Sequence, residues 1–113
     1  LLKQIMGIKT DSTPMEDSKN PDSCNVFALY SLLANETQIK NLRKKYISGG
    51  MGYGQIKQAL FELILSTFDE ARSKFEYYHK NPVEVSIALA KGSVKAQKVA
   101  NSVLMRVRKK IGY

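Results

Sequence analysis

Hydrophobic residues recur along this chain at the three- and four-residue spacing of amphipathic helices. Five such segments are separated by polar or glycine-containing breaks, and "LLKQIM" at the start has the pattern of a helix end. The predicted segments cover residues 24–34, 36–47, 54–80, 82–91 and 94–111. No segment alternates with a period of two. The pattern therefore predicts an all-α fold, a compact helical bundle of about five helices.

The breaks carry residues that commonly begin or end helices. Asp22 or Ser23 is expected to cap the first segment, and Asn81 the fourth. Gly92 is expected to end the fourth segment, with Ser93 capping the last one. The segment 54–80 is apolar around much of its circumference, which predicts that it is covered from two directions.

The 113 residues are enough for one hydrophobic core and too few for two ordinary domains. Because the chain starts on an amphipathic segment without methionine, we expect it to be cut from a longer protein. No apolar stretch approaches the ~20 residues that span a bilayer, and the start lacks a signal-peptide pattern. We expect a cytoplasmic protein that makes no membrane contact.

The composition excludes several kinds of site. One cysteine cannot form an internal disulfide, and one cysteine with one histidine cannot provide four zinc ligands. Cys24 as a nucleophile would need a base, and the only imidazole belongs to the distant His79. We therefore expect Cys24 to be a small, partly buried residue, and we predict neither catalytic residues nor a metal site.

The stretch "GGMGYGQIKQ" (49–58) resembles a phosphate-binding loop but lacks its context. A nucleotide-binding glycine loop follows a strand, and a Walker loop places lysine and then serine or threonine directly after its last glycine. The glycines are instead expected to allow a tight turn at positive φ between two helices. Lys57, in the first turn of the next helix, remains open to two interpretations: a phosphate contact, or a stem packed along the buried face.

The net charge of +8 is concentrated at one end. Residues 1–84 contain ten acidic and eleven basic residues, whereas residues 85–113 contain seven basic residues and no acid. On a helix, one set of polar positions falls within an arc of ~80°, at ~100° per residue. They are Lys95, Lys98, Ser102, Arg106 and Lys109. A solvated face would explain this stripe, but the absence of acids favours a polyanionic partner.

Four ordered segments also resemble a known family. They are "TDSTP" (10–14), "CN" (24–25), "GGMGYGQIKQAL" (49–60) and "GSVKAQKVANSVLMRVRKKIG" (92–112). Together they are similar to the C-terminal domain of bacterial-type tryptophanyl-tRNA synthetases, which are class I enzymes. The resemblance implies a helical anticodon-binding domain at 22–113, preceded by a connecting segment at 1–21 that follows the catalytic domain.

The resemblance also implies a parent enzyme with partners. The parent would be a homodimeric tryptophan–tRNA ligase that uses ATP and magnesium, and this chain would contact tRNA(Trp) and its own catalytic domain. The family's nucleotide signatures, His-Ile-Gly-His and Lys-Met-Ser-Lys-Ser, do not occur in these residues. We therefore expect the chain alone to be inactive and to hold no cofactor.

The resemblance and the charge pattern together indicate which residues are expected to bind tRNA. They are Lys57, Tyr53, Lys95, Lys98, Arg106 and Lys109. The alternative is a helical protein-interaction or dimerisation module that uses the apolar face of the long segment. Salt distinguishes the two, because nucleic-acid binding weakens steeply as salt rises and apolar association does not.

Overall fold

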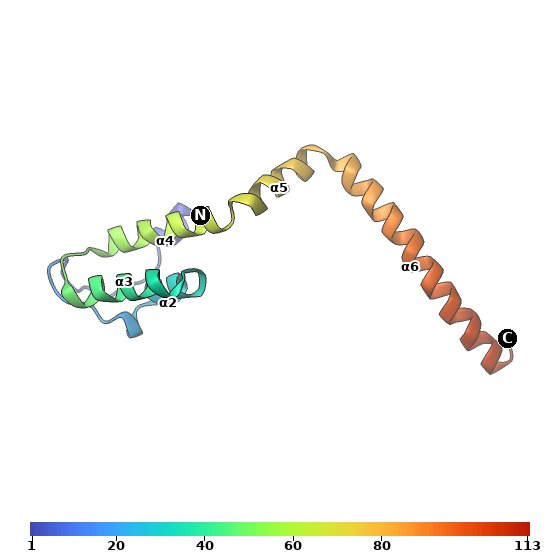
Figure 1. Cartoon of the computed structure of the whole chain (residues 1–113), viewed down its shortest axis with the longest axis horizontal. Helices are drawn as coiled ribbons and strands as arrows, with labels where there is room; N and C mark the ends of the chain where they lie inside the picture. The colour runs from blue at the N-terminus through green and yellow to red at the C-terminus, as the bar shows by residue number, and fades with distance from the viewer. The chain divides into compact units, whose positions relative to one another are not determined.

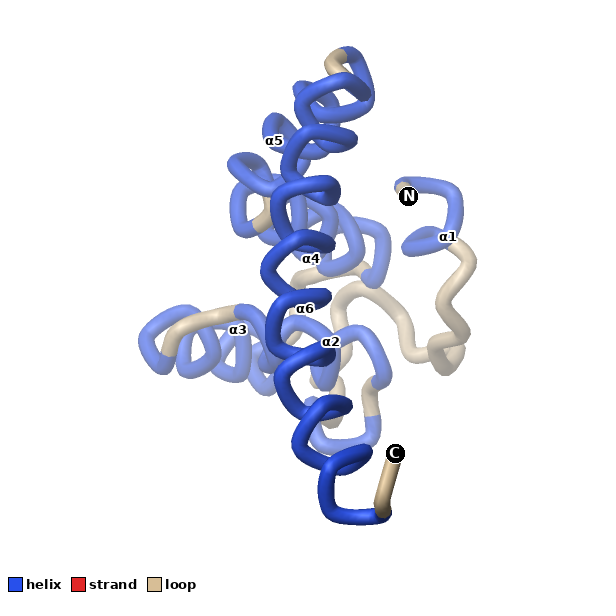
Figure 2. The backbone as a smooth tube through the Cα atoms, turned by 90° about the vertical axis from the view of Figure 1, so that its right-hand side faces the viewer, coloured by secondary structure: helices blue, strands red, loops and turns tan.

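The computed structural model describes residues 1–113 and contains helices joined by loops, with no strand, which confirms the predicted all-α fold class (Figure 2). The α-helices are α1 (Leu2–Met6), α2 (Asn25–Leu33), α3 (Glu36–Ser48), α4 (Tyr53–Thr67), α5 (Asp69–Lys80) and α6 (Pro82–Ile111). A short 3-10 helix, η1 (Pro21–Ser23), precedes α2. The chain divides into two compact units, residues 1–70 and residues 71–113 (Figure 1).

The first unit contains the hydrophobic core. Helices α1 and α2 both pack against α4. The core combines apolar side chains from all four helices of this unit with one from the 3-10 helix end: Ile5, Cys24, Val26, Phe27, Leu42, Tyr46, Ile56 and Leu60. The Phe27 and Tyr46 rings meet edge to face, with their centroids 5.2 Å apart. This arrangement favours aromatic pairs beyond the area they bury.

The start of α2 differs from the prediction. Neither Asp22 nor Ser23 caps this helix, because both belong to η1, where Asn20 accepts a hydrogen bond from the Asp22 amide. Cys24 occupies the N-cap of α2 without a side-chain hydrogen bond. Asp22 instead pairs with Arg43 of α3 at 2.7 Å, an exposed ion pair that adds little stability.

The predicted break at Asn35 is confirmed. The Asn35 side chain accepts from the Gln38 amide, and the Gln38 side chain accepts from the Asn35 amide, both at 2.9 Å. This reciprocal capping box satisfies two amides at the start of α3 that have no partner within the helix.

The predicted helix over 54–80 is two helices, because α4 ends at Thr67. The hydroxyls of Ser66 and Thr67 both donate to the Leu63 carbonyl, at 3.0 and 2.7 Å. Such bonds compete with the helical backbone ladder and weaken it locally. Asp69 and Glu70 then stand in the first turn of α5, where acidic side chains are stabilised by the helix dipole.

In the second unit, the break predicted at Gly92 is absent. Helix α6 runs through Gly92 and Ser93 without interruption and ends at Gly112, which has a left-handed backbone at φ 87°. A glycine inside a helix costs about 1 kcal/mol relative to alanine, and the helical residues on both sides outweigh this cost. Within this unit, neither α5 nor α6 buries a side chain.

The glycine turn between α3 and α4 has the backbone role predicted for it. Gly49 and Gly50 have φ values of 73° and 79°, and they are the only positive-φ residues apart from Gly112. At Gly49 the ψ of −171° places the backbone in a region that is essentially restricted to glycine. A Cβ there would also collide with the Glu16 carbonyl oxygen, because the turn lies directly against the 14–19 loop.

We therefore expect Gly49→Ala to destabilise the first unit by about 3 kcal/mol or to prevent its folding, since backbone strain of ~1–3 kcal/mol is added to a collision. Gly54→Ala is the matched control, because Gly54 is helical and has open space around its Cβ position. The control should be neutral or slightly stabilising. Urea denaturation followed by circular dichroism measures both; equal stability of the two variants would contradict the close approach at Gly49.

Candidate nucleic-acid interface

The two candidate regions lie in different units. Tyr53 and Lys57 belong to α4 in the first unit, and the basic stripe belongs to α6 in the second. The stripe residues therefore share helix α6, and the two residues near the glycine turn share helix α4.

Lys57 is nearly buried, and its ammonium group binds main-chain carbonyls. The side chain is 9% exposed, and Nζ donates to the Met6 oxygen at 2.9 Å and to the Ile8 oxygen at 2.7 Å. These carbonyls lie at the end of α1, where the last oxygens of a helix have no partner within it and attract cations. The bonds tie the end of α1 to α4.

Tyr53 stands one turn earlier and makes a polar contact with the N-terminal segment. Its hydroxyl donates to Asp11 Oδ1 at 2.6 Å. The Thr13 amide donates to the same oxygen at 3.0 Å. The ammonium of Lys19 lies 5.4 Å from the centroid of the Tyr53 ring, within the range of a cation–π contact. Contacts at the hydroxyl and at the face of the ring therefore both hold Tyr53 in place.

Lys19 is a structural residue that the sequence pattern did not indicate. Its side chain is 3% exposed, and Nζ donates to the carbonyls of Pro14, Met15 and Asp17 at 2.9, 3.3 and 3.2 Å. The Lys19 amide donates to the Tyr46 oxygen at 2.7 Å. Lysine in a polar loop is usually solvated, so only the three-dimensional arrangement reveals that this one organises the loop.

A cavity of about 210 Å³ lies beside Tyr53. Its lining is mostly polar and comes from the N-terminal segment, the start of α2 and α4: Lys9, Thr10, Asp11, Ser23, Cys24, Asn25 and Tyr53. The sequence prediction included Tyr53 but missed Asp11. The resemblance segment "TDSTP" was the one signal that marked Asp11. The wall of the cavity carries hydrogen-bond donors and acceptors, and the one carboxylate in it belongs to Asp11.

The polar contacts shift the titration of this region. The hydrogen bond from Tyr53 is the main cause that lowers the pKa of Asp11, followed by those from Thr13. Burial and then the bond to Asp11 raise the pKa of Tyr53 to about 12. Burial, with a smaller effect of the Cys24 thiol 3.2 Å away, also raises the pKa of Tyr46. Both tyrosines are thus held protonated.

The stripe on α6 is fully exposed. Lys95, Lys98, Ser102, Arg106 and Lys109 all project from one continuous helix. Glu84 is the last acid of the chain, so the stripe has no acidic neighbour later in α6. An exposed basic row of this kind attracts polyanions at long range and releases counterions on binding them.

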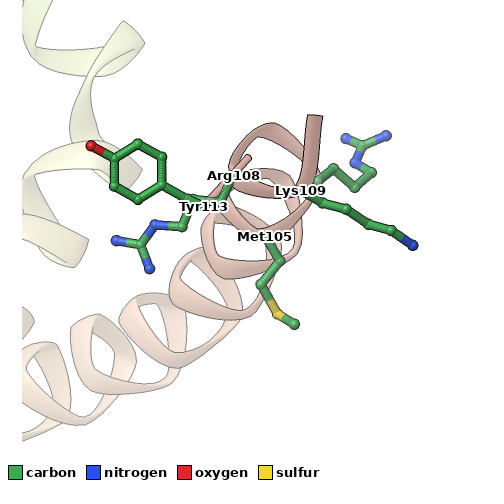
Figure 3. A pocket seen from close by; sticks show the side chains of 5 residues that line it. Met105, Arg108, Lys109 and Tyr113 are labelled. Atoms are coloured by element: carbon green, nitrogen blue, oxygen red, sulfur yellow. The ribbon is translucent and has the colours of Figure 1, made fainter. Parts of the chain in front are cut away.

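Shallow hollows flank the stripe. One is lined by Lys98, Val99, Ser102, Val103 and Arg106, and another lies at the end of α6. In Figure 3, Arg108 and Tyr113 lie on one side of the helix end and Lys109 on the other, with Met105 between them. These side chains diverge, so the hollow is part of an open surface and not an enclosed ligand site.

Two further properties of the structure bear on function. No three side chains of the kinds that bind metals lie together in a group that could hold an ion. No helix combines the length and the apolar composition that a membrane-spanning segment needs.

Comparisons with known proteins identify similar chains. No family model matches. A tryptophan–tRNA ligase of Rhodopirellula baltica is 43% identical over 110 residues, which are 97% of this chain and 34% of that protein. A tryptophan–tRNA ligase of Pseudomonas aeruginosa is 32% identical over 96% of this chain and 24% of its own length. The chain thus spans about a third or less of the length of these relatives.

A solved structure gives the same result for the fold. The tryptophanyl-tRNA synthetase of Campylobacter jejuni, in complex with ADP and tryptophan, superposes with a TM-score of 0.94 at 38% identity. The match covers 99% of this chain and 35% of that chain. At this identity and coverage, the likeness extends to the whole fold described above.

The shifted pKa of Tyr53 predicts how stability depends on pH. The folded protein holds Tyr53 protonated up to about pH 12, whereas an unfolded tyrosine ionises near 10.0. Its stabilising effect is therefore fully present below pH 10 and is lost as the pH rises through 12. Tyr53→Phe should lose less stability over this interval, measured by urea denaturation at pH 9 and pH 11. Identical losses in both proteins would show that the Asp11–Tyr53 contact is not maintained.

Proposed function

We propose, from the premise that this chain is homologous to the C-terminal domain of tryptophan–tRNA ligases, that it recognises the anticodon of tRNA(Trp). The observation that carries the proposal is the 43% identity over 97% of the chain. The cationic face of α6 supports it, because phosphate contacts need exposed lysine and arginine side chains in a row. The domain limits proposed are residues 22–113, with residues 1–21 as the connecting segment.

For the whole protein we propose the ligase reaction. ATP, L-tryptophan and tRNA(Trp) give L-tryptophanyl-tRNA(Trp), AMP and diphosphate. The nucleotide signatures of the family do not occur in these residues, so this chemistry would belong to the catalytic domain. ATP and magnesium, a homodimeric assembly and a cytoplasmic location are parts of the same proposal, and this chain would serve as the tRNA-binding part.

The two regions are proposed to divide the work of holding tRNA. Phosphate contacts supply affinity without sequence information, whereas selectivity needs groups that reach base edges or stack on unpaired bases. Lys95, Lys98, Arg106 and Lys109 would supply phosphate contacts. Tyr53 lines a cavity with polar edges and would approach a base. Lys57, bound to the carbonyls of Met6 and Ile8, would act through the position of the N-terminal segment.

Changing Lys95, Lys98, Arg106 and Lys109 together to glutamine should weaken all tRNAs alike. Each lost contact lowers the slope of log affinity against log salt by roughly 0.7 to 0.9. Fluorescence anisotropy with labelled tRNA(Trp) from 50 to 300 mM salt measures this slope. The matched control changes four exposed lysines of the first unit to glutamine: Lys3, Lys40, Lys44 and Lys45. If the stripe variant remains folded and keeps the wild-type salt slope, the stripe is a solvated face that does not bind tRNA.

Changing Tyr53 to Phe, or Lys57 to Met, should instead reduce the preference for tRNA(Trp) over an anticodon-swapped transcript. Tyr53→Phe removes the hydroxyl from the cavity wall, and Tyr113→Phe, at a 91% exposed residue, is its control. Lys57→Met also removes two bonds from a charged donor and should cost roughly 1.5 to 3 kcal/mol, with exposed Lys44→Met as control. The affinity ratio of the two transcripts is the readout. An unchanged ratio in both variants would exclude this region from anticodon selection.

A further inference from the structure

The continuity of α6 through Gly92 brings Lys91 into line with the basic stripe. From Lys91 the polar positions follow at intervals of 4, 3, 4, 4 and 3 residues, which average the 3.6 residues of a helical turn. The six positions are Lys91, Lys95, Lys98, Ser102, Arg106 and Lys109. At a rise of ~1.5 Å per residue, the row extends ~27 Å along the helix.

We propose that Lys91 is the first of these six positions to bind the phosphate backbone of RNA, and that the interface on α6 begins there. The proposal rests on the proposed function and deepens it. Lys91 is exposed and lies one turn from Lys95, close enough for both ammonium groups to bind successive phosphates of one strand. Ser102 supplies a neutral hydroxyl donor in the middle of the row, where no cation stands.

The row has a defined start because of Glu84. This residue lies seven positions before Lys91, two helical turns away on the same side of α6. Its carboxylate accepts a hydrogen bond from the Tyr77 hydroxyl of α5 at 2.6 Å, which fixes the negative charge at the beginning of the helix. A phosphate would be repelled there. Lys91 is therefore the first position on this side where a phosphate gains a cation.

A basic amphipathic helix also fits an anionic membrane surface, because membrane binding of such helices grows with the apolar area that they insert. Helix α6 exposes large apolar side chains near Lys91, among them Leu89, Val94 and Val99. RNA is the partner proposed here because the relatives that match this chain over nearly its whole length are tRNA ligases. The membrane surface is the alternative outcome of the test.

The test changes Lys91 to glutamine in the full chain and measures binding of tRNA(Trp) across salt concentrations. We expect the log–log slope to fall by roughly 0.7 to 0.9 and the affinity at 0.1 M salt to fall on the order of fivefold. The matched control is Arg108→Gln, which loses the same charge on the same helix but lies about 80° or more around the helix from every residue of the row. It should change the slope by much less.

Two changes at Gly92 test the role of helix continuity. Gly92→Ala introduces a Cβ into open space and stiffens the helix, so it should preserve or raise the affinity. Gly92→Pro should break α6 next to Lys91 and lower the slope by as much as Lys91→Gln does. Adding Lys91→Gln to Gly92→Pro should then cause no further loss. A further loss in the double variant would show that Lys91 acts independently of the row.

The outcomes separate this inference from the proposed function. If Lys91→Gln matches the wild type while the four-residue stripe variant loses slope, the interface begins at Lys95 and the inference is wrong. If the wild-type chain does not bind tRNA(Trp), both fail together. Vesicles of phosphatidylcholine and phosphatidylserine in a 3:1 ratio provide the last arm. Binding to them at concentrations that give no tRNA complex would assign α6 to a membrane surface.

Discussion

The first unit depends on buried lysine side chains that bind main-chain carbonyls. Lys57 holds the end of α1 against α4, and Lys19 gathers three carbonyls of the loop that precedes η1. The N-terminal segment supplies only Ile5 to the core among its first twenty residues, so apolar packing alone would not fix it. Each ammonium group is buried and surrounded by oxygen acceptors, which offsets the loss of its hydration. Asp11 can stand beside Tyr53, and Gly49 can lie against the 14–19 loop, because these bonds define the path of the chain.

Much of the fold was predictable because helical periodicity and capping are local properties. The breaks at Asn35 and at the glycine turn were read correctly, since a capping box and adjacent glycines at positive φ leave clear signals. The errors have a common cause. Ser66 and Thr67 end α4 through side-chain bonds to one carbonyl, whereas Gly92 fails to end α6 although glycine usually would. Glycine inside a helix costs only about 1 kcal/mol, and serine or threonine bonds to a helical carbonyl weaken the helix only slightly. Hydrophobic periodicity does not resolve local differences this small.

The site was less predictable than the fold. The sequence indicated a basic row from its spacing, but the expected stop at Gly92 separated Lys91 from it. It left two interpretations open for Lys57, and nothing in a single sequence distinguishes a solvated ammonium from one enclosed by carbonyls 49 and 51 residues earlier in the chain. The resemblance segment "TDSTP" contains Asp11, but only the structure shows its bond to Tyr53. The general lesson is that charge patterns along one helix can be read directly, whereas polar contacts between distant segments need coordinates.

The only cysteine of the chain is a buried residue at the edge of the core. Cys24 is 8% exposed, and its sulfur lies 3.2 Å from the Tyr46 hydroxyl, at the point where η1 meets α2. A thiol in such a position reacts with alkylating reagents mainly when the surrounding core opens. The rate of its modification therefore reports the opening equilibrium of the first unit, without an introduced label and without interference from a second thiol. The protein thus contains a native chemical reporter for local unfolding of the region that carries Tyr53 and Lys57.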